Sequence, residues 1–304
     1  MNRINQTDQS RKCSTCPRRC GVDRNQQPGF CGMPAEIRLA KAALHPWEEP
    51  CISGKNGSGA LFFCGCNLRC VFCQNRMISQ GELTGTPVSP EKLRELMLRL
   101  RDEGACSINL VTPTHYAPAL APVLREVRPA LGIPVVYNCG GYESVETLRM
   151  LEGLIDIYLP DCKYFDAGLS GRYSSAPDYF PVARDALREM LRQTGRPVFS
   201  ADGTLLRGVM VRHLVLPGCR HDSIRLLEEL CGTFGSSAFL LSLMSQYSPE
   251  FAPETADANL RRRLTSFEYS SVLNAARQLG FSGYMQMRSA SGTAYTPDFR
   301  NATF

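Results

Sequence analysis

The sequence has little net charge, no long apolar run and no apolar segment at its start. Its 304 residues carry 34 Lys and Arg against 29 Asp and Glu, a formal net charge of only +5. This small excess gives no electrostatic reason to expect a nucleic acid as partner. No segment approaches the roughly 20 apolar residues of a membrane-spanning helix, and the polar start lacks the apolar core of a secretory signal. We therefore expect a cytoplasmic protein without a membrane partner.

Cysteine, by contrast, is abundant, with 14 residues in the chain. In a small secreted protein this number would predict disulfides, whereas in a long chain without a signal segment it predicts metal binding. The cysteines form one group of three, one group of four and several isolated residues.

The group of three is Cys66, Cys70 and Cys73, separated by three and two residues. Three thiolates can hold three irons of a four-iron cluster, which leaves one iron open to bind and reduce a small molecule. A zinc knuckle is the alternative, but zinc sites usually have four ligands and no fourth Cys or His follows closely. Cys64 is a rival ligand, although its position at a strand end predicts that its side chain points elsewhere.

The run from Gly65 to Asn75, which contains these cysteines, resembles the radical S-adenosylmethionine (radical SAM) superfamily. The resemblance implies a [4Fe-4S] cluster whose open iron is chelated by SAM. One electron, from a donor of flavodoxin or ferredoxin type, then splits SAM into methionine and a 5′-deoxyadenosyl radical that abstracts hydrogen from a substrate. It also implies that Phe72, just before the third cysteine, lies beside the adenine.

Apolar strands and amphipathic helices alternate along the rest of the chain. We expect strands near 60–63, 107–111, 134–137, 154–159, 209–216, 238–243 and 283–287, and helices near 90–103, 118–130, 144–152, 180–193, 223–230 and 266–279. This alternation predicts parallel strands joined by crossover helices, either as an open doubly wound sheet or as a barrel. The resemblance implies the second, an α/β partial (β/α)6 barrel, in residues 59–304, with a small Cys-rich N-terminal extension in residues 1–58.

Polar side chains follow three of the expected strands. They are Thr114 and His115, then Asn138, then Asp161 and Lys163. Sites in such barrels lie at the carboxyl ends of the strands, so we expect these residues at the barrel mouth as SAM contacts. His115 could equally be an ordinary loop histidine. Asp161 and Lys163 are either a surface ion pair or a pair in which Lys163 binds the methionine carboxylate and Asp161 orients it.

Longer stretches of the sequence resemble a narrower group than the radical SAM superfamily as a whole. Asp161-Cys162-Lys163 and the stretch 212–218 resemble the enzymes that activate pyruvate formate-lyase, and a group related to these activases is similar to the stretches 16–21, 47–54, 111–116 and 242–247. The resemblance implies a glycyl radical enzyme as protein partner. Activases hold the SAM amino group with a Gly-Gly-Glu motif, whereas this chain has Thr112-Pro113-Thr114-His115, so Thr114 or His115 is expected to substitute. The alternatives are a radical SAM enzyme acting on a small molecule or peptide, and a non-catalytic iron–sulfur or metal-binding protein.

The group of four cysteines is Cys13, Cys16, Cys20 and Cys31, with gaps of two, three and ten residues. Four thiolates in a region with little core predict a closed metal site that contributes folding energy. Zinc, a second iron–sulfur cluster and free thiols all remain open from the sequence.

Overall fold

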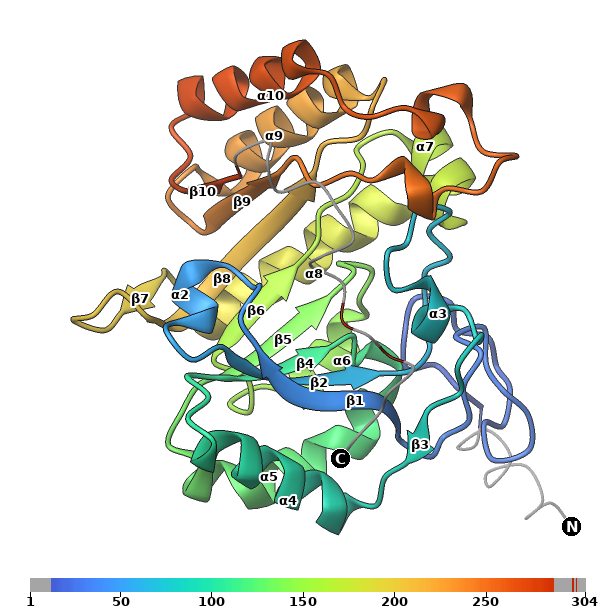
Figure 1. Cartoon of the computed structure of the whole chain (residues 1–304), viewed down its shortest axis with the longest axis vertical. Coiled ribbons are helices and arrows are strands. Elements are labelled where there is room, and N and C mark those ends of the chain that lie inside the picture. The colour runs from blue at the N-terminus through green and yellow to red at the C-terminus, as the bar shows by residue number, and fades with distance from the viewer. Residues whose placement is uncertain (1–11, 287–296, 298, 300–304) are drawn as a thin grey trace, which may run out of the picture.

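A computed structural model describes residues 12–286, 297 and 299 of the chain. Its centre is a ten-stranded sheet in the order β10-β9-β8-β6-β5-β4-β2-β1-β3, with β7 paired to β8 (Figure 1). Seven neighbouring strands are parallel: β2 (Ser58–Phe63), β4 (Ile108–Val111), β5 (Val135–Cys139), β6 (Ile157–Pro160), β8 (Leu205–Leu214), β9 (Leu240–Met244) and β10 (Gly283–Met285). The sheet curves but its two edge strands do not pair, so the barrel is partial.

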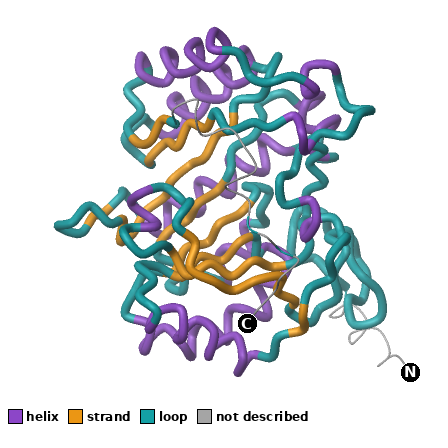
Figure 2. Tube along the Cα trace, in the orientation of Figure 1, coloured by secondary structure: helices purple, strands orange, loops and turns teal. Residues whose placement is uncertain are grey.

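Six helices connect the parallel strands and cover the outer face of the sheet (Figure 2). They are α4 (Pro90–Asp102), α5 (Ala117–Leu131), α6 (Val145–Met150), α8 (Tyr179–Thr194), α9 (Arg220–Phe234) and α10 (Ser266–Gln278). Each follows one parallel strand and precedes the next. The predicted partial (β/α)6 barrel, with its Cys-rich N-terminal segment, is therefore confirmed.

The predicted elements form for the local reasons that the sequence indicates. Every residue of β2, β4, β5, β6 and β9 is buried, as expected of parallel strands covered on both faces. Helix α4 begins after Ser89, whose side chain accepts a hydrogen bond from the Lys92 N–H. Helix α10 begins with the predicted capping box of Thr265 and Glu268.

Helix α5 forms although it contains Pro122 and Pro129, each of which removes a backbone donor. Its buried stripe includes Leu120, Leu124 and Val127. Burial of such side chains contributes about 1.5–3 kcal/mol each, and together they offset the cost of the prolines. Strand β6 departs further from its predicted range, because it starts at Ile157 rather than at Leu154.

Several elements were not expected from the sequence. They are the strands β1 (Arg38–His45), β3 (Thr86–Pro87) and β7 (Val198–Phe199), and the short helices α2 (Pro50–Ser53), α3 (Arg76–Ser79) and α7 (Ala167–Ser174). Strand β1 runs antiparallel beside β2, so the sheet begins inside the N-terminal segment. The division of the chain at residue 58 remains a prediction. The last predicted strand is present at 283–285, and its predicted end at residue 287 lies outside the described residues.

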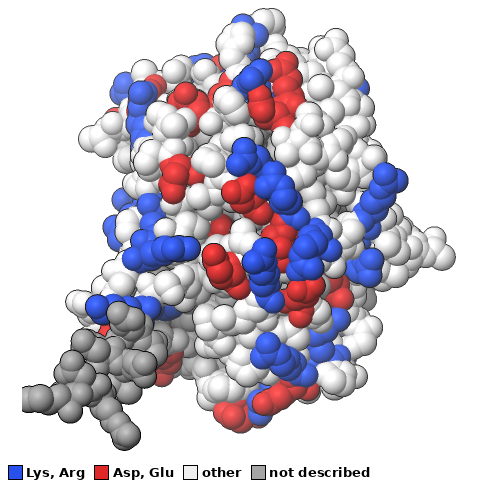
Figure 3. Space-filling view, turned by 180° about the vertical axis from the view of Figure 1, so that it is seen from behind, with Lys and Arg blue, Asp and Glu red and all other residues white. Residues whose placement is uncertain are grey.

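Charged side chains of both signs are intermingled on the face opposite to that of Figure 1 (Figure 3). None of the helices in the described part of the chain has the length and apolar character needed to cross a bilayer.

Candidate active site

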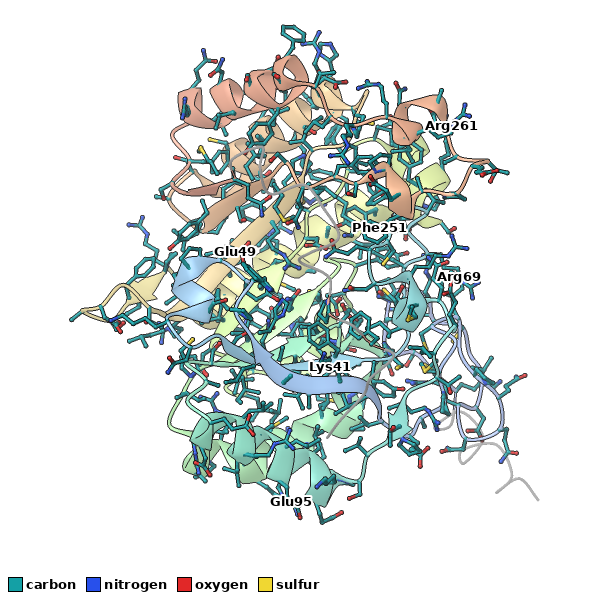
Figure 4. The ribbon with its side chains drawn as sticks, viewed as in Figure 1. Lys41, Glu49, Arg69, Glu95, Phe251 and Arg261 are labelled. Atoms are coloured by element: carbon teal, nitrogen blue, oxygen red, sulfur yellow. The ribbon has the colours of Figure 1, made fainter. Side chains whose placement is uncertain are left out.

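The cysteine loop leaves the carboxyl end of β2 through a tight turn at Gly65. Its φ is +84°, and a Cβ there would lie 2.3 Å from Met33 Cγ and 2.7 Å from the Cys31 carbonyl oxygen, so only glycine fits. The turn brings Cys66, Cys70 and Cys73 to one cavity of about 210 Å³. The cavity lies where the parallel strands end, as the sequence predicts. Figure 4 labels Arg69 of this loop and Phe251, which lines the same cavity.

Each of the three sulfurs has a polar neighbour. The Leu68 N–H donates to Cys66 Sγ at 3.4 Å, the Ser174 hydroxyl donates to Cys70 Sγ at 3.0 Å, and the Ser79 hydroxyl lies 3.3 Å from Cys73 Sγ. Burial raises the pKa of the Cys66 and Cys73 thiols, and the nearby Cys70 raises both further. Buried thiolates this close together need a compensating positive charge.

The chemistry of this donor set fits an iron–sulfur cluster. The structure has, over the residues it describes, no group of three or more His, Cys, Asp or Glu side chains arranged around one metal-ion position. In a four-iron cluster each thiolate binds a different iron, so the ligands surround a wider centre than a single ion. Cys64 is fully buried and does not line the cavity, in agreement with the expected direction of its side chain.

An ionic network lies beside the cysteines. Lys163 Nζ is 2.5 Å from Asp161 Oδ2, and Arg212 Nε is 3.0 Å from Asp161 Oδ1. These three side chains line the cavity and are only 17–19% exposed, so the pair is not a surface ion pair. Burial alone would raise the pKa of Asp161, but the charges of Lys163 and Arg212 hold it below its usual range.

Arg212 extends this network towards Glu48. It donates to Glu48 Oε2 at 3.3 Å and to Asn138 Oδ1 at 2.6 Å, while the Asn138 amide donates to Glu48 Oε1 at 3.2 Å. Asn109 supplies one more donor to Glu48 Oε1 at 2.9 Å. Asn138 was expected at the site, whereas Glu48 and Arg212 were not proposed as site residues. The only signal for them was that the stretches 47–54 and 212–218 belonged to the resemblance.

The period of two along each strand explains why these residues meet. Val136, Ile157 and Met210 point inward near the amino ends of β5, β6 and β8, where they pack with Ile52 of α2. Residues two further along β5 and β8, and the residue directly after the end of β6, therefore point inward at the level of the network. Asn138, Asp161 and Arg212 are those residues.

Phe72 lies in the wall of the cavity that contains the cysteines. It lines the cavity, is 9% exposed and has its ring centroid 6.1 Å from that of Tyr247. Tyr247 belongs to the stretch 242–247 and, together with Leu216, completes an apolar wall next to the cysteines. Such a wall suits the flat face of an adenine ring.

Thr114 and His115 do not line the cavity, and this placement does not support their expected contact with SAM. Their loop folds into the 3-10 turn η1 (Thr114–Tyr116), which buries both side chains. The Thr114 hydroxyl donates to Glu143 Oε1 at 2.8 Å, and His115 Nε2 lies 2.8 Å from the Cys64 carbonyl oxygen. Burial lowers the pKa of His115 to about 3, which keeps the ring neutral. Thr112 of the same loop does line the cavity.

The four N-terminal cysteines lie in loops. A Cβ on Gly29 would be 3.4 Å from Cys20 Sγ and 3.5 Å from Cys31 Sγ, so these sulfurs flank that glycine. Burial raises the pKa of the Cys16 thiol to about 12, although the Arg18 N–H bonds to its sulfur. The described cysteines are not arranged around one metal-ion position, so a metal at Cys13, Cys16, Cys20 and Cys31 stays a prediction.

The sequence is 30% identical over 279 residues to uncharacterized protein MJ0674 of Methanocaldococcus jannaschii, an alignment that covers 88% of this chain and 75% of that protein. The chain belongs to the MJ0674 family. No protein-family model matches the sequence.

Several solved structures resemble the chain in fold. A radical SAM methyltransferase from Sphaerobacter thermophilus superposes with a TM-score of 0.52 at 14% identity, over 75% of this chain and 66% of that one. Streptococcus suis SuiB bound to its precursor peptide superposes with a TM-score of 0.48 at 15% identity, over 73% of this chain and 46% of SuiB. The chain thus spans about half the length of SuiB. At this identity the first likeness shows the fold alone, and that fold is the radical SAM barrel.

Proposed function

We propose that the chain is a radical SAM enzyme. The observation that carries the proposal is that Cys66, Cys70 and Cys73 line one buried cavity at the strand ends of a radical SAM barrel. They would hold three irons of a [4Fe-4S] cluster, which supplies the electron that cleaves SAM to a 5′-deoxyadenosyl radical. We place this chemistry in the reducing cytoplasm, where cysteine thiols persist without forming disulfides.

The side chains around the cysteines have distinct tasks. Lys163 has three N–H donors, and its bond to Asp161 leaves donors for an anion in the cavity, such as the SAM carboxylate. Asp161 holds the ammonium in place, and Arg212 in turn holds Asp161. The apolar wall of Phe72 and Tyr247 receives the adenine and keeps water from the reacting atoms.

For the hydrogen donor we propose a protein, in the first place a glycyl radical enzyme. The support is the Asp161–Lys163 pair at the cavity, which has the sequence pattern of the activases. The electron would come from a flavodoxin or ferredoxin. A peptide or small-molecule substrate is the alternative, and the unused Thr114–His115 loop favours it because the SAM amino group must be held differently here.

The test is anaerobic reconstitution of the full chain with iron and sulfide, followed by incubation with SAM and dithionite. We expect about four irons per chain at the cysteine loop, an electron paramagnetic resonance signal that changes when SAM is added, and release of 5′-deoxyadenosine. Protein that binds the cluster and releases no 5′-deoxyadenosine would instead be a non-catalytic iron–sulfur protein. A glycyl radical signal on an added glycyl radical enzyme would identify the activase form.

A further inference from the structure

A second cavity of about 290 Å³ adjoins the first. The two share six residues, so the second continues from the ionic network: His45, Glu48, Gln74, Arg212, Met244 and Gln246. Its far side is formed by the segment that precedes α2 and by residues of β9 and β10. Glu49, labelled beside α2 in Figure 4, lies on this side. It belongs to the stretch 47–54, and the proposed function assigns it no role.

Glu48 and Glu49 are adjacent in sequence but differ in their partners. Both oxygens of Glu48 are bonded, one to Arg212 and the other to the amides of Asn109 and Asn138. Glu49 has a hydrogen bond from the Ser242 hydroxyl, while its Oε2 is buried and has no hydrogen-bond partner. Among the ion pairs of the described residues none includes Glu49.

Among the Asp, Glu, Lys and Arg side chains of the two cavities, Glu49 is the excess group. Lys163 and Arg212 are matched by Asp161 and Glu48 within one network. Glu49 adds a fifth charge, and burial raises its pKa despite the field of Arg212. A buried carboxylate without a partner is costly, and a cation that enters the cavity would remove that cost.

The rest of the lining suits the stem of such a cation. Trp47, Tyr284 and Met285 line the same cavity. Aromatic and thioether side chains pack well on an aliphatic chain, and aromatic rings also attract ammonium and guanidinium groups.

We propose that the second cavity binds a primary ammonium or guanidinium group of the substrate, with Glu49 as its ion partner. That this cation belongs to the substrate of the enzyme rests on the proposed function, because the adjoining cavity is the one that holds the cysteines. The substrate class is then an amine or a guanidine, free or as a Lys or Arg side chain, whose other end reaches the first cavity.

The test uses two small probes of the same shape, pentylamine and pentanol, with the reconstituted full chain. Ligand-observed NMR at millimolar concentration measures their affinities for the wild type, Glu49→Gln, Glu49→Asp and the control Glu95→Gln. Glu95 is an exposed residue of α4, labelled in Figure 4, that pairs with Lys92. The wild type and Glu95→Gln are expected to bind pentylamine at least about tenfold more tightly than pentanol.

Glu49→Gln keeps the shape and loses the charge, so its preference for the amine should vanish. Glu49→Asp keeps the charge and should retain part of the preference, which separates charge recognition from a folding defect. Equal binding of amine and alcohol by the wild type, no binding of the amine, or unchanged amine binding by Glu49→Gln overturns the proposal.

Release of 5′-deoxyadenosine by the wild type is measured on the same preparation. Release without a Glu49-dependent preference for the amine rejects the cation site alone. A Glu49-dependent preference without release supports the cation site and rejects the proposed function.

Discussion

The two groups of cysteines differ in what supports them. Cys66, Cys70 and Cys73 follow a fully buried strand and line a cavity at the end of a parallel sheet. Cys13 to Cys31 lie in the segment 12–37, where the structure has only the isolated bridge between Lys12 and Asp23 before β1 begins. The first group is positioned by the core of the barrel, whereas the second depends on turns and on its own contacts.

The two regions are nevertheless joined. The Cys66 N–H donates to the Cys31 carbonyl oxygen at 3.3 Å, and Arg18 Nε donates to the Asn67 carbonyl oxygen at 2.8 Å. Arg24, only 8% exposed, bonds the His115 carbonyl oxygen. The barrel therefore supplies the site, while the N-terminal loops hold the cysteine loop in place.

The largest effect is expected for Cys70→Ala. It removes one of three cluster ligands, so iron content should fall and 5′-deoxyadenosine should drop to background. Cys64→Ala is the matched control, because Cys64 is buried nearby and does not line the cavity. Full activity in Cys70→Ala, or loss of iron in Cys64→Ala, would mean that the ligand assignment is wrong.

Cys16→Ala tests the other group of cysteines. If the four N-terminal thiolates hold a metal, the wild type contains metal beyond the cluster iron, and this variant loses it while the iron at Cys66, Cys70 and Cys73 remains. Metal analysis by mass spectrometry measures both, and limited proteolysis should show increased cleavage within 12–37. Identical metal content in variant and wild type would show that these cysteines are free thiols.

Asp161→Asn removes the carboxylate between two buried cations. Lys163 would then lose its ion partner and Arg212 would keep only Glu48, so the free energy of unfolding should fall by about 3–5 kcal/mol. Urea denaturation measures the change, with Asp102→Asn as control. Asp102 is 65% exposed and pairs with Arg101 on the surface, so its loss should stay within about 0.5 kcal/mol.

The raised pKa of Glu143 predicts that the stability of the fold depends on pH. Burial raises its pKa from 4.5 to about 7, although Thr114 and Tyr137 donate hydrogen bonds to it. The folded state therefore holds the proton of the Glu143 carboxyl group more tightly than the unfolded state does. The contribution of this proton to the free energy of unfolding is complete below pH 4.5 and disappears as the pH rises through 7. The loss amounts to about 3 kcal/mol for a shift of this size.

Glu143→Gln should remove this slope. The difference in unfolding free energy between wild type and variant is therefore expected to change between these two pH values and to be constant above pH 8 or so. His115 acts in the opposite direction, because its pKa is lowered and its contribution is lost on acidification. Because His115 is present in both proteins, the difference between them reports Glu143 alone. Parallel curves of unfolding free energy against pH for the two proteins would contradict the raised pKa of Glu143.

Arg18→Ala is expected to have the smallest effect, a loss of about 1–3 kcal/mol. It removes the bond to the Asn67 carbonyl and the stacking of the guanidinium 4.1 Å over the Phe30 ring. The same variant should lose iron from the cluster faster in a chelator, because the cysteine loop is less firmly held. Arg261→Ala, an exposed arginine labelled in Figure 4, is the control. Equal rates of iron loss would show that the N-terminal loops do not support the site.

Much of the barrel could be predicted from the sequence because its helices and strands are specified locally. The stripe of Leu93, Leu96, Met97 and Leu100 and the capping box of Thr265 and Glu268 each depend on residues within a few positions of one another. Strand β1 was missed because its place is set by pairing with β2. Its sequence, RLAKAALH, has no regular alternation to indicate a strand.

At the site, a short motif after a single strand was enough to predict that Cys66, Cys70 and Cys73 lie together, and another that Asp161 and Lys163 lie beside them. The contact of Glu48 with Arg212, 164 residues away, and the position of Glu49 without an ion partner could be seen only in the tertiary structure. The tertiary structure also places Thr114 and His115 outside the lining of the cavity, because the 3-10 turn buries both side chains. Local spacing specifies which chemistry a loop can perform, whereas the curvature and register of the sheet specify which distant side chains share its cavity.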